Sequence, residues 1–106
     1  MERMFAALAL VVLLCGCTSQ PANQADAEKA QDACAAACIT ALSGGQDLGN
    51  GPCLSNQVID DWVCDVAHSP REAVDNQPEN QCPAFRNGDA HHFVEVDSKC
   101  NVLKVY

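Results

Sequence analysis

Hydrophobic residues are distributed unevenly along the chain, and the first segment differs from the rest. Residues 5–14 (FAALALVVLL) form an uninterrupted apolar run of ten residues, preceded by Met1–Met4 with one arginine and one glutamate. A helix across the hydrocarbon core of a bilayer needs roughly 17–25 residues, so this run is too short to span one. A short apolar run behind a brief charged start predicts the hydrophobic region of an export signal peptide.

The next patterned stretch predicts the main helix. Residues 25–42 are rich in alanine, with glutamate, glutamine and lysine in the first half, and all of these residues favour helices. Gly44-Gly45 then ends the helix, as glycine does in a left-handed C-terminal cap. Small residues follow one another at intervals of three and four, which allows close packing on a partner: Ala27, Ala30, Cys34, Cys38 and Ala41.

Weaker patterns occupy the middle of the chain. Residues 44–52 hold four of the six glycines and predict a loop. Residues 62–67 are rich in β-forming side chains and predict a strand after a turn. Ser69-Pro70-Arg71-Glu72 has the form of a capping box with proline at the first helical position, so a short helical turn should follow. Residues 75–88 predict an irregular loop held by Cys82.

The last sixteen residues predict a β-hairpin. Residues 91–96 and 101–106 are β-type runs around a turn centred on Ser98-Lys99. This register sets Val94 opposite Leu103 and places Glu95 diagonally across from Lys104, a modest favourable pair. The predicted fold class is therefore α+β: a small disulfide-rich domain with one N-terminal helix packed on a small antiparallel sheet that ends in the hairpin.

Composition and charge narrow the class of protein. The chain has 106 residues, eight cysteines and only 5% aromatic residues, which indicates one small domain with covalent cross-links in place of a large core. Its net charge of −8 disfavours binding to nucleic acid or electrostatic adhesion to anionic lipid. We expect no nucleic-acid partner and no cofactor.

Residues 14–17 (Leu-Cys-Gly-Cys) resemble the lipobox of prokaryotic lipoprotein precursors. The resemblance implies a diacylglyceryl thioether on Cys17, cleavage after Gly16, and further acylation with chains such as palmitate. It divides the chain into a signal peptide (1–16), the lipidated cysteine with a flexible tether (17–24) and the folded domain (25–106). The mature protein would be extracytoplasmic and lipid-anchored to the cell membrane or, as Thr18 favours in two-membrane bacteria, to the outer membrane.

Six cysteines remain in the predicted domain: Cys34, Cys38, Cys53, Cys64, Cys82 and Cys100. An exported domain with an even number of cysteines predicts disulfides, and the lack of a Cys-x-x-Cys pair disfavours a zinc or redox site. Cys34 and Cys38 lie on one helix face with parallel side chains, so they cannot pair with each other. Among fifteen pairings, we favour Cys38 with Cys53, Cys34 with Cys100, and Cys64 with Cys82.

The imidazoles are the first candidates for a chemical site. Adjacent strand residues point to opposite faces, so only one of His91 and His92 could join His68 in a metal site. These histidines could also form an acid–base set for phosphodiester cleavage with Glu95, Arg71 and Arg86, although the acidic chain would repel such a substrate. Surface or hydrogen-bonded structural histidines are the favoured interpretation, and we predict no catalytic residue.

The acidic residues and the single tryptophan are the remaining candidates. Asp60-Asp61 with Asp65, and Asp47 with Asn50, offer oxygen ligands for calcium, but no loop has the regular calcium-binding spacing. A solvated acidic surface is the favoured interpretation. In a domain this poor in aromatic residues, Trp62 is predicted to anchor the core rather than to contact a partner.

The preferred function is a non-catalytic binding or interaction module, held at the membrane through Cys17, with an envelope protein as a candidate partner. One alternative is a metal-binding or small hydrolytic module that uses His68 and His91 or His92. Another is a protease inhibitor-like scaffold that inserts an exposed loop near Cys82-Pro83 into a protease cleft. No residue pattern in the chain identifies the ligand.

Overall fold

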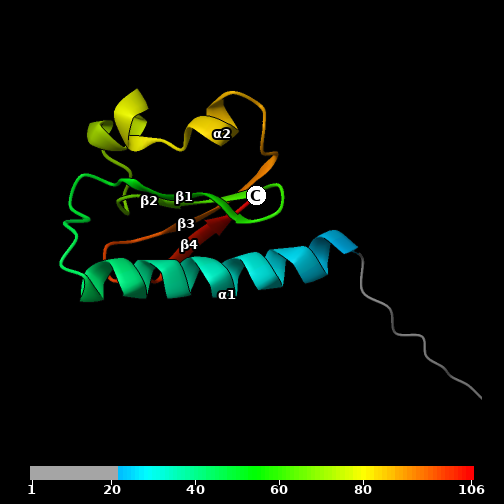
Figure 1. Cartoon of the computed structure of the whole chain (residues 1–106). Helices are drawn as coiled ribbons and strands as arrows, with labels where there is room; N and C mark the ends of the chain where they lie inside the picture. The colour runs from blue at the N-terminus through cyan, green and yellow to red at the C-terminus, as the bar shows by residue number, and fades with distance from the viewer. Residues whose placement is uncertain (1–21) are drawn as a thin grey trace, which may run out of the picture.

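The computed structural model describes residues 22–106. The predicted signal peptide, Cys17 and residues 18–21 lie outside the described residues. In chain order the elements are α1 (Ala22–Ser43), β1 (Cys53–Ile59), β2 (Trp62–Val66), η2 (Ala73–Asn76), η3 (Pro78–Asn80), α2 (Pro83–Arg86), β3 (His92–Val96) and β4 (Val102–Val105). The α+β fold class is confirmed: one long helix packs on a four-stranded sheet (Figure 1).

The sheet has the strand order β1-β2-β3-β4 and is mixed rather than purely antiparallel. The two outer pairs are antiparallel, whereas the central strands β2 and β3 run parallel, with Trp62 opposite His92 and Val66 opposite Val96. Parallel neighbours require a crossover connection. Residues 67–91 provide it and carry the short helical elements η2, η3 and α2.

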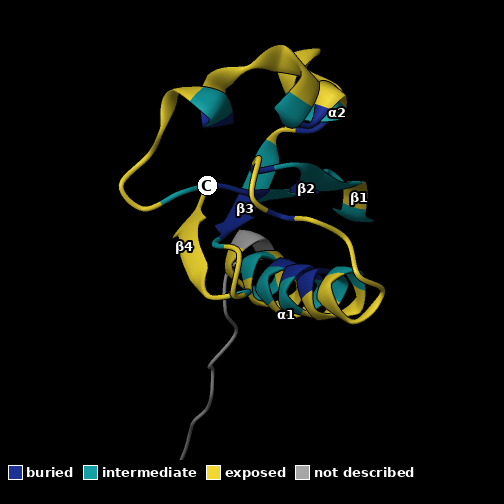
Figure 2. Ribbon diagram, turned by 90° about the vertical axis from the view of Figure 1, so that its left-hand side faces the viewer, coloured by how far each residue is buried: buried dark blue, intermediate teal, exposed yellow. Residues whose placement is uncertain are grey.

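Helix α1 covers one face of the sheet along its length (Figures 1 and 2). It begins at Ala22, three residues before the predicted start, and ends before Gly45, whose φ of 83° forms the predicted left-handed cap. Its small residues Ala30, Cys34 and Cys38 are fully buried, as predicted. They pack on the alternate side chains of the central strands, among them Trp62, Cys64, Val66, Val94 and Val96.

The crossover covers part of the opposite face and forms a second, smaller core. Val63, Cys82 and Ala90 are buried there, and Cys53, Ala84, Phe85 and Phe93 pack around them. The molecule therefore has three layers, with α1, the sheet and the crossover stacked in that order (Figure 1). Among residues 22–106, no helix is long and apolar enough to cross a membrane.

Three disulfides connect these layers: Cys34–Cys64, Cys38–Cys100 and Cys53–Cys82. The prediction that Cys34 and Cys38 bond separately and attach the helix twice is confirmed, but all three favoured pairings are wrong. One helical turn separates Cys34 from Cys38, so the first meets the middle of β2 and the second meets the β3–β4 turn. Cys53 lies on the other face, where it meets the crossover.

The predicted hairpin is present, with a register two residues away from the expected one. Val94 faces Val105, and Glu95 lies directly opposite Lys104. The carboxylate of Asp97 accepts hydrogen bonds from the backbone N–H groups of Lys99 and Asn101, and Cys100 adopts φ 70°. This left-handed residue lengthens the turn and shifts the pairing. The pairing is shifted by one residue at Val96 and Val102 and by two beyond an irregularity between Glu95 and Val96, so Val94 and Glu95 keep their expected faces.

Two other local predictions are corrected. The sequence pattern missed β1, whose central residues Ser55, Asn56 and Gln57 are polar. The helical turn after Pro70 is real, but its capping box is formed by Glu72 and Asp75 instead of Ser69 and Glu72. The predicted irregular loop over residues 75–88 contains η3 and α2 and is held by Cys82, as expected.

Candidate functional site

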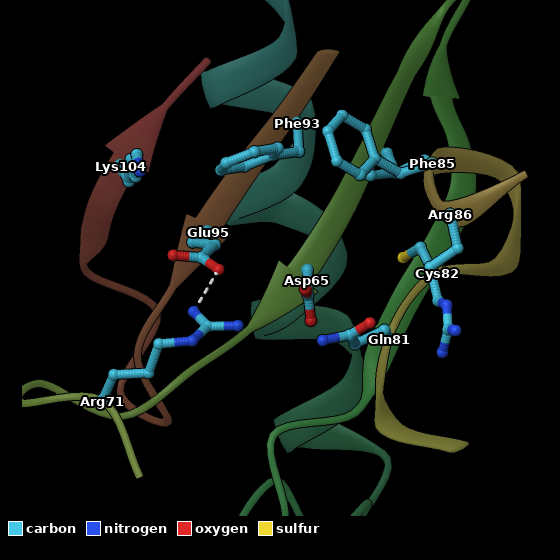
Figure 3. Close-up of a pocket in the computed structure, with 10 residues that line it drawn as sticks. Asp65, Arg71, Gln81, Cys82, Phe85, Arg86, Phe93, Glu95 and Lys104 are labelled. Carbon is cyan, nitrogen blue, oxygen red and sulfur yellow. Dashed lines mark hydrogen bonds and ion pairs between the residues drawn. The ribbon is translucent and has the colours of Figure 1, made fainter. Parts of the chain in front are cut away.

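A cleft of about 520 Å³ lies between the sheet and the crossover, on the face opposite α1 (Figure 3). Its floor is formed by the outward side chains of the central strands, and its walls come from the crossover and from β4. Three kinds of residue line it: the apolar Val63, Cys82, Phe85 and Phe93; the acidic Asp65 and Glu95 with Gln81; and the basic Arg71, Arg86 and Lys104.

Two carboxyl groups lie side by side on the floor. Asp65 on β2 and Glu95 on β3 are register partners in the parallel pair, and they point away from α1 because their neighbours Cys64 and Val94 face the helix. Adjacent strands lie about 4.8 Å apart, so these two acidic groups influence each other's ionisation. The alternation of each strand therefore gives it one apolar face and one face that carries a carboxyl group.

Asp65 is the unusual member of the pair. Its Oδ1 atom is buried and has no hydrogen-bond partner among the described residues. Burial is the main cause that raises the pKa of Asp65 to about 7, the nearby Glu95 charge adds to the rise, and the Arg71 charge opposes it. Near neutral pH this carboxyl group therefore exchanges between its charged and neutral forms, which makes it both a donor and an acceptor.

Glu95, in contrast, has a dedicated partner. Arg71 Nη1 donates to its Oε2 at 2.7 Å, in a charge-assisted hydrogen bond. The other guanidinium nitrogens donate to the Asn76 side chain and the Asp75 carbonyl oxygen. Arg71 is thus held by the crossover, and its charge is compensated within the cleft.

The other two cations of the cleft are not compensated in this way. Arg86 on α2 and Lys104 on β4 form no ion pair with any residue of 22–106. Lys104 extends over the ring of Phe93, 5.7 Å from its centroid, instead of pairing with Glu95 opposite. Five of the chain's six lysines and arginines lie in the described residues, and three of those five line this cleft.

Aromatic side chains form one end of the cleft. Phe85 meets Phe93 edge-on, with ring centroids 5.0 Å apart, and Tyr106 stacks on Phe93 at 5.2 Å. Three of the four aromatic residues outside the leading segment therefore gather here, in a chain that has few. Figure 3 shows Phe85 and Phe93 at one end of the cleft and the carboxyl groups beside them.

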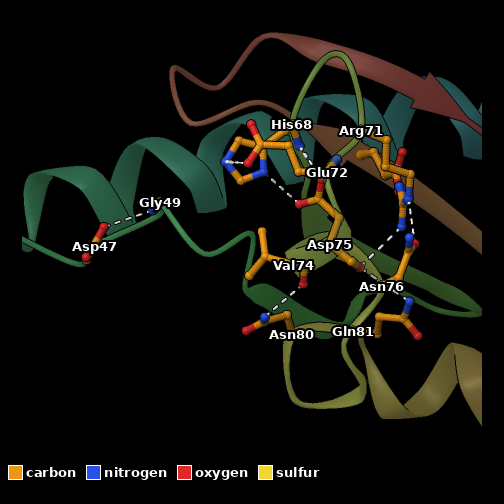
Figure 4. Close-up of polar contacts among 11 residues, drawn as sticks. Asp47, Gly49, His68, Arg71, Glu72, Val74, Asp75, Asn76, Asn80 and Gln81 are labelled. Atoms are coloured by element: carbon orange, nitrogen blue, oxygen red, sulfur yellow. Dashed lines mark hydrogen bonds and ion pairs between the residues drawn. The ribbon is translucent and has the colours of Figure 1, made fainter.

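His68 belongs to a separate polar cluster at the end of β2 (Figure 4). Its Nδ1 lies 2.9 Å from Oδ1 of Asp75, whose carboxylate also accepts hydrogen bonds from the backbone N–H groups of His68 and Glu72. Burial opposes ionisation of Asp75, yet these hydrogen bonds lower its pKa, and the bond with Asp75 raises the pKa of His68. The cluster fixes the start of the crossover.

His91 and His92 lie at the other end of the central strands. His91 Nδ1 contacts the carboxylate of Asp61 at 2.7 Å, and His92 stacks on Trp62 with ring centroids 4.6 Å apart. His92 is in register with the first residue of β2, whereas His68 follows the last residue by two, so the strand separates them. Within residues 22–106, no group of three or more histidine, cysteine, aspartate or glutamate side chains is placed to hold a metal ion.

The remaining sequence candidates also have structural positions. Trp62 is buried between α1 and the sheet, as predicted for a core anchor. Asp61 accepts hydrogen bonds from His91 at the start of β3, and Asp47 accepts one from the N–H of Gly49. Asp65 points into the cleft, away from the two aspartates of the β1–β2 turn with which it was grouped.

The structure thus brings together Asp65, Glu95, Arg71 and Arg86, each named from the sequence for other chemistry. Phe85 and Phe93 carry no sequence signal that marks them as site residues, and Lys104 is predicted only as a partner of Glu95. The available clue was alternation: Val63 with Asp65, and Phe93 with Glu95, lie on the strand faces away from the helix. All six cysteines of the domain are paired, so no thiol nucleophile is present in the described residues.

Searches of protein-family models, curated proteins and solved structures find no match for this chain.

Proposed function

We propose that the chain is an exported lipoprotein, anchored through Cys17, whose domain is a non-catalytic binding module with the cleft as its binding site. One observation carries the binding role: the carboxyl group of Asp65, whose buried Oδ1 has no hydrogen-bond partner among residues 22–106, belongs to the floor of a cleft open to solvent. Leaving a buried acceptor unpaired costs about 1–3 kcal/mol. A ligand that donates a hydrogen bond to Asp65 removes this cost.

The cleft has the size and composition of a small-molecule site. Its volume of about 520 Å³ falls within the usual range of roughly 300–1,000 Å³ for ligand pockets. Apolar walls, a few convergent polar groups and a carboxyl group with a shifted pKa occur together in it. In this aromatic-poor domain, two of the four aromatic residues and three of the five basic residues of the described part of the chain line the same cleft.

Binding is favoured over hydrolysis for a chemical reason. Acid–base cleavage uses two groups that are free to act on the substrate, and in this cleft Glu95 is occupied by its ion pair with Arg71. Among the two carboxyl groups of the cleft floor, only Asp65 is outside this ion pair. The histidines proposed for a metal or hydrolytic module are divided between two clusters at opposite ends of β2.

The alternative of a protease inhibitor has less support. Pro83 begins the one-turn helix α2, and Cys82 before it is buried and bonded to Cys53. This segment is therefore packed against the sheet instead of projecting as an extended loop. Three disulfides are compatible with an extracytoplasmic location, where such bonds persist.

A ligand scan tests the binding role. The mature protein, solubilised in a neutral detergent, is heated in the presence of small cationic, neutral and anionic aromatic compounds. We expect at least one charge class to raise the melting temperature of the wild type and of Asp60→Ala, but not of Asp65→Ala. Asp60 is an exposed carboxylate outside the cleft, so it controls for the loss of charge. If no class stabilises the wild type, or if Asp65→Ala responds equally, the cleft is not a binding site.

A further inference from the structure

The two edge strands of the sheet differ in how they are protected from pairing with another chain. β1 has polar residues at its centre, and two register shifts interrupt its pairing with β2. β4 is the other edge strand, and no strand of residues 22–106 pairs with its outer side (Figure 2). All four of its residues are exposed. The exposed large apolar side chains of the described residues all lie on α1, on β4 or directly after β4: Ile39, Leu42, Val102, Leu103, Val105 and Tyr106. An exposed apolar edge strand is suited to pairing with another chain.

The backbone of β4 shows which groups are available to pair. Tyr106 exchanges both of its backbone hydrogen bonds with Phe93 on β3. Because the direction of the backbone groups alternates along a strand, those of Lys104 also point toward β3, whereas those of Leu103 and Val105 point to the outer edge. Leu103 and Val105 therefore present two donors and two acceptors to an incoming strand. Their side chains and the side chain of Lys104 lie on opposite faces of the sheet.

Lys104 is the only charged residue of β4. Glu95, which lies opposite it on β3, is bonded to Arg71 instead. The Nζ atom of Lys104 lies 5.7 Å from the centroid of the Phe93 ring, and it forms no ion pair with any residue of 22–106. A carboxylate opposite Lys104 on an added strand would therefore form a favourable cross-strand pair.

The same lysine opposes pairing with a second copy of the chain. Antiparallel pairing of two β4 strands through their outward groups sets Leu103 of each copy opposite Val105 of the other. Lys104 then lies directly opposite its own equivalent, and like charges in this position are destabilising. The net charge of −8 on each chain adds to the repulsion. The edge therefore favours a foreign strand of opposite charge.

We infer that β4 binds an extended segment of another protein by adding it to the sheet as a fifth, antiparallel strand. The segment carries a glutamate or aspartate opposite Lys104, flanked by apolar residues opposite Leu103 and Val105. In this mode of recognition the backbone hydrogen bonds supply affinity, and the side-chain pairs supply specificity. The inference goes beyond the proposed role of the cleft, because it concerns the edge of the sheet, which shares only Lys104 with the cleft lining.

Nuclear magnetic resonance titration of the detergent-solubilised mature protein tests the inference, with the peptide acetyl-Thr-Val-Glu-Val-Thr-amide as the probe. We expect the amide resonances of Leu103 and Val105 to shift and their hydrogen exchange to slow, because their N–H groups become hydrogen-bonded. A peptide with lysine in place of glutamate should bind about fivefold more weakly, which corresponds to about 1 kcal/mol, because it replaces an attractive cross-strand pair with a repulsive one.

Matched controls separate the backbone pairing from the charge. N-methylation of both valines removes the peptide N–H groups that point to β4 and should abolish binding. N-methylation of the glutamate, whose N–H points away from β4, should leave binding within about twofold of the unmodified peptide. Lys104→Glu should reverse the preference and bind the lysine peptide more tightly. Lys29→Glu, which changes an exposed lysine on α1, should keep the preference of the wild type.

Several results would overturn the inference. They are no binding of the glutamate peptide, the same peptide preference in the wild type and Lys104→Glu, or equal binding of the two N-methylated peptides. A dimer of the mature protein that Leu103→Pro dissociates would also overturn it, because a second copy would then occupy the edge. None of these results depends on the ligand scan, so the binding role of the cleft is judged separately.

Discussion

Asp65 occupies a position in the fold whose surroundings disfavour the charged form of its carboxyl group. Its backbone completes the central strand β2 in register with β3, so the side chain cannot leave the face opposite α1. Arg71, whose charge acts on Asp65, is directed to Glu95 by a hydrogen bond of 2.7 Å. The neutral form of Asp65 is therefore stabilised relative to the charged form. The charged form lowers the stability of the folded domain, and it does so at a position that faces a cleft.

The raised pKa of Asp65 predicts a pH-dependent loss of stability. The unfolded chain loses this proton near the ordinary value of 3.8 and the folded domain near 7, so the folded state binds more protons between these values. The contribution of Asp65 to stability is therefore complete below about pH 4 and falls as the pH rises through 7. Asp65→Asn, which has no such proton, should nearly equal the wild type at pH 4 and exceed it by roughly 3–5 kcal/mol at pH 8, because each unit of pKa difference corresponds to about 1.4 kcal/mol.

Urea unfolding of both proteins at the two pH values measures this difference. His68, whose pKa is also raised, contributes equally to both proteins and cancels in the comparison. A stability difference that does not change between pH 4 and pH 8 contradicts the assignment of the shift to Asp65.

Gly51 is a second residue whose identity is set by its surroundings. Its φ is +69°, and an added Cβ would lie 2.5 Å from Oδ1 of Asp75 and 2.9 Å from the carbonyl oxygen of Val66. Both atoms belong to the cluster that starts the crossover, and the Asp75 carboxylate is fixed by three hydrogen bonds. Any side chain at position 51 would displace them.

We therefore predict that Gly51→Ala destabilises the domain more than Gly45→Ala does. Gly45 has φ +83° with no atom within 4 Å of its added Cβ, so that variant bears only the cost of left-handed backbone, about 1–2 kcal/mol. Gly51→Ala bears this cost and the steric contact together. Thermal unfolding of the two variants measures the difference. Equal melting temperatures would show that the crossover moves to accommodate the added methyl group without a loss of stability.

At the level of elements, the sequence predicts what depends on local patterns. Helix α1 and the C-terminal hairpin have clear periodicity and end signals, and both are present. Strand β1 was missed because its exposed centre is polar, with Ser55, Asn56 and Gln57 on an edge strand. The parallel pairing of β2 and β3 and the disulfide partners depend on how the 25-residue connection folds back, which no local pattern records.

The cleft could not be predicted from the sequence for the same reason. Asp65, Arg71, Arg86 and Glu95 were recognised as chemically able, but they were assigned to calcium or histidine sites that the structure does not assemble. They meet only because the crossover returns over the sheet and places α2 beside β2. Phe85 and Phe93, far apart in sequence from Val63, form the apolar wall through the same packing.

The Cys53–Cys82 disulfide is the covalent link between the crossover and the sheet. We predict that the double variant Cys53→Ala, Cys82→Ala loses ligand binding in the cleft but retains the helix–sheet core, because Cys34–Cys64 and Cys38–Cys100 remain. Removing this cross-link, which closes a loop of about 30 residues, should lower the free energy of unfolding by roughly 3–4 kcal/mol. Hydrogen exchange measures the effect: protection should fall in residues 71–90 and persist in α1 and β2. A uniform loss of protection would show that the two cores unfold as one.

At the scale of the whole molecule, three thin layers share two small cores. The larger core uses alanine and cysteine on the helix side and the smaller one contains few large side chains, so neither buries much apolar area. The disulfides compensate by linking α1 to β2, α1 to the β3–β4 turn, and the crossover to β1. Every layer is therefore covalently attached to another, an arrangement that suits small proteins outside the cytoplasm.

The same disulfides limit which cysteines can carry the proposed lipid anchor. Because all six domain cysteines are paired, only Cys15 and Cys17 remain as thiols that can accept a lipid. We predict that bacteria expressing the full chain incorporate an alkyne analogue of palmitate into it, and that Cys17→Ser abolishes the label while Cys15→Ser keeps it. The labelled protein should begin at Cys17 and partition into detergent, whereas the Cys17→Ser protein should not. Retention of the label by Cys17→Ser, or a mature chain that still begins at Met1, would refute the anchor and leave the binding role of the cleft to be judged on the ligand scan.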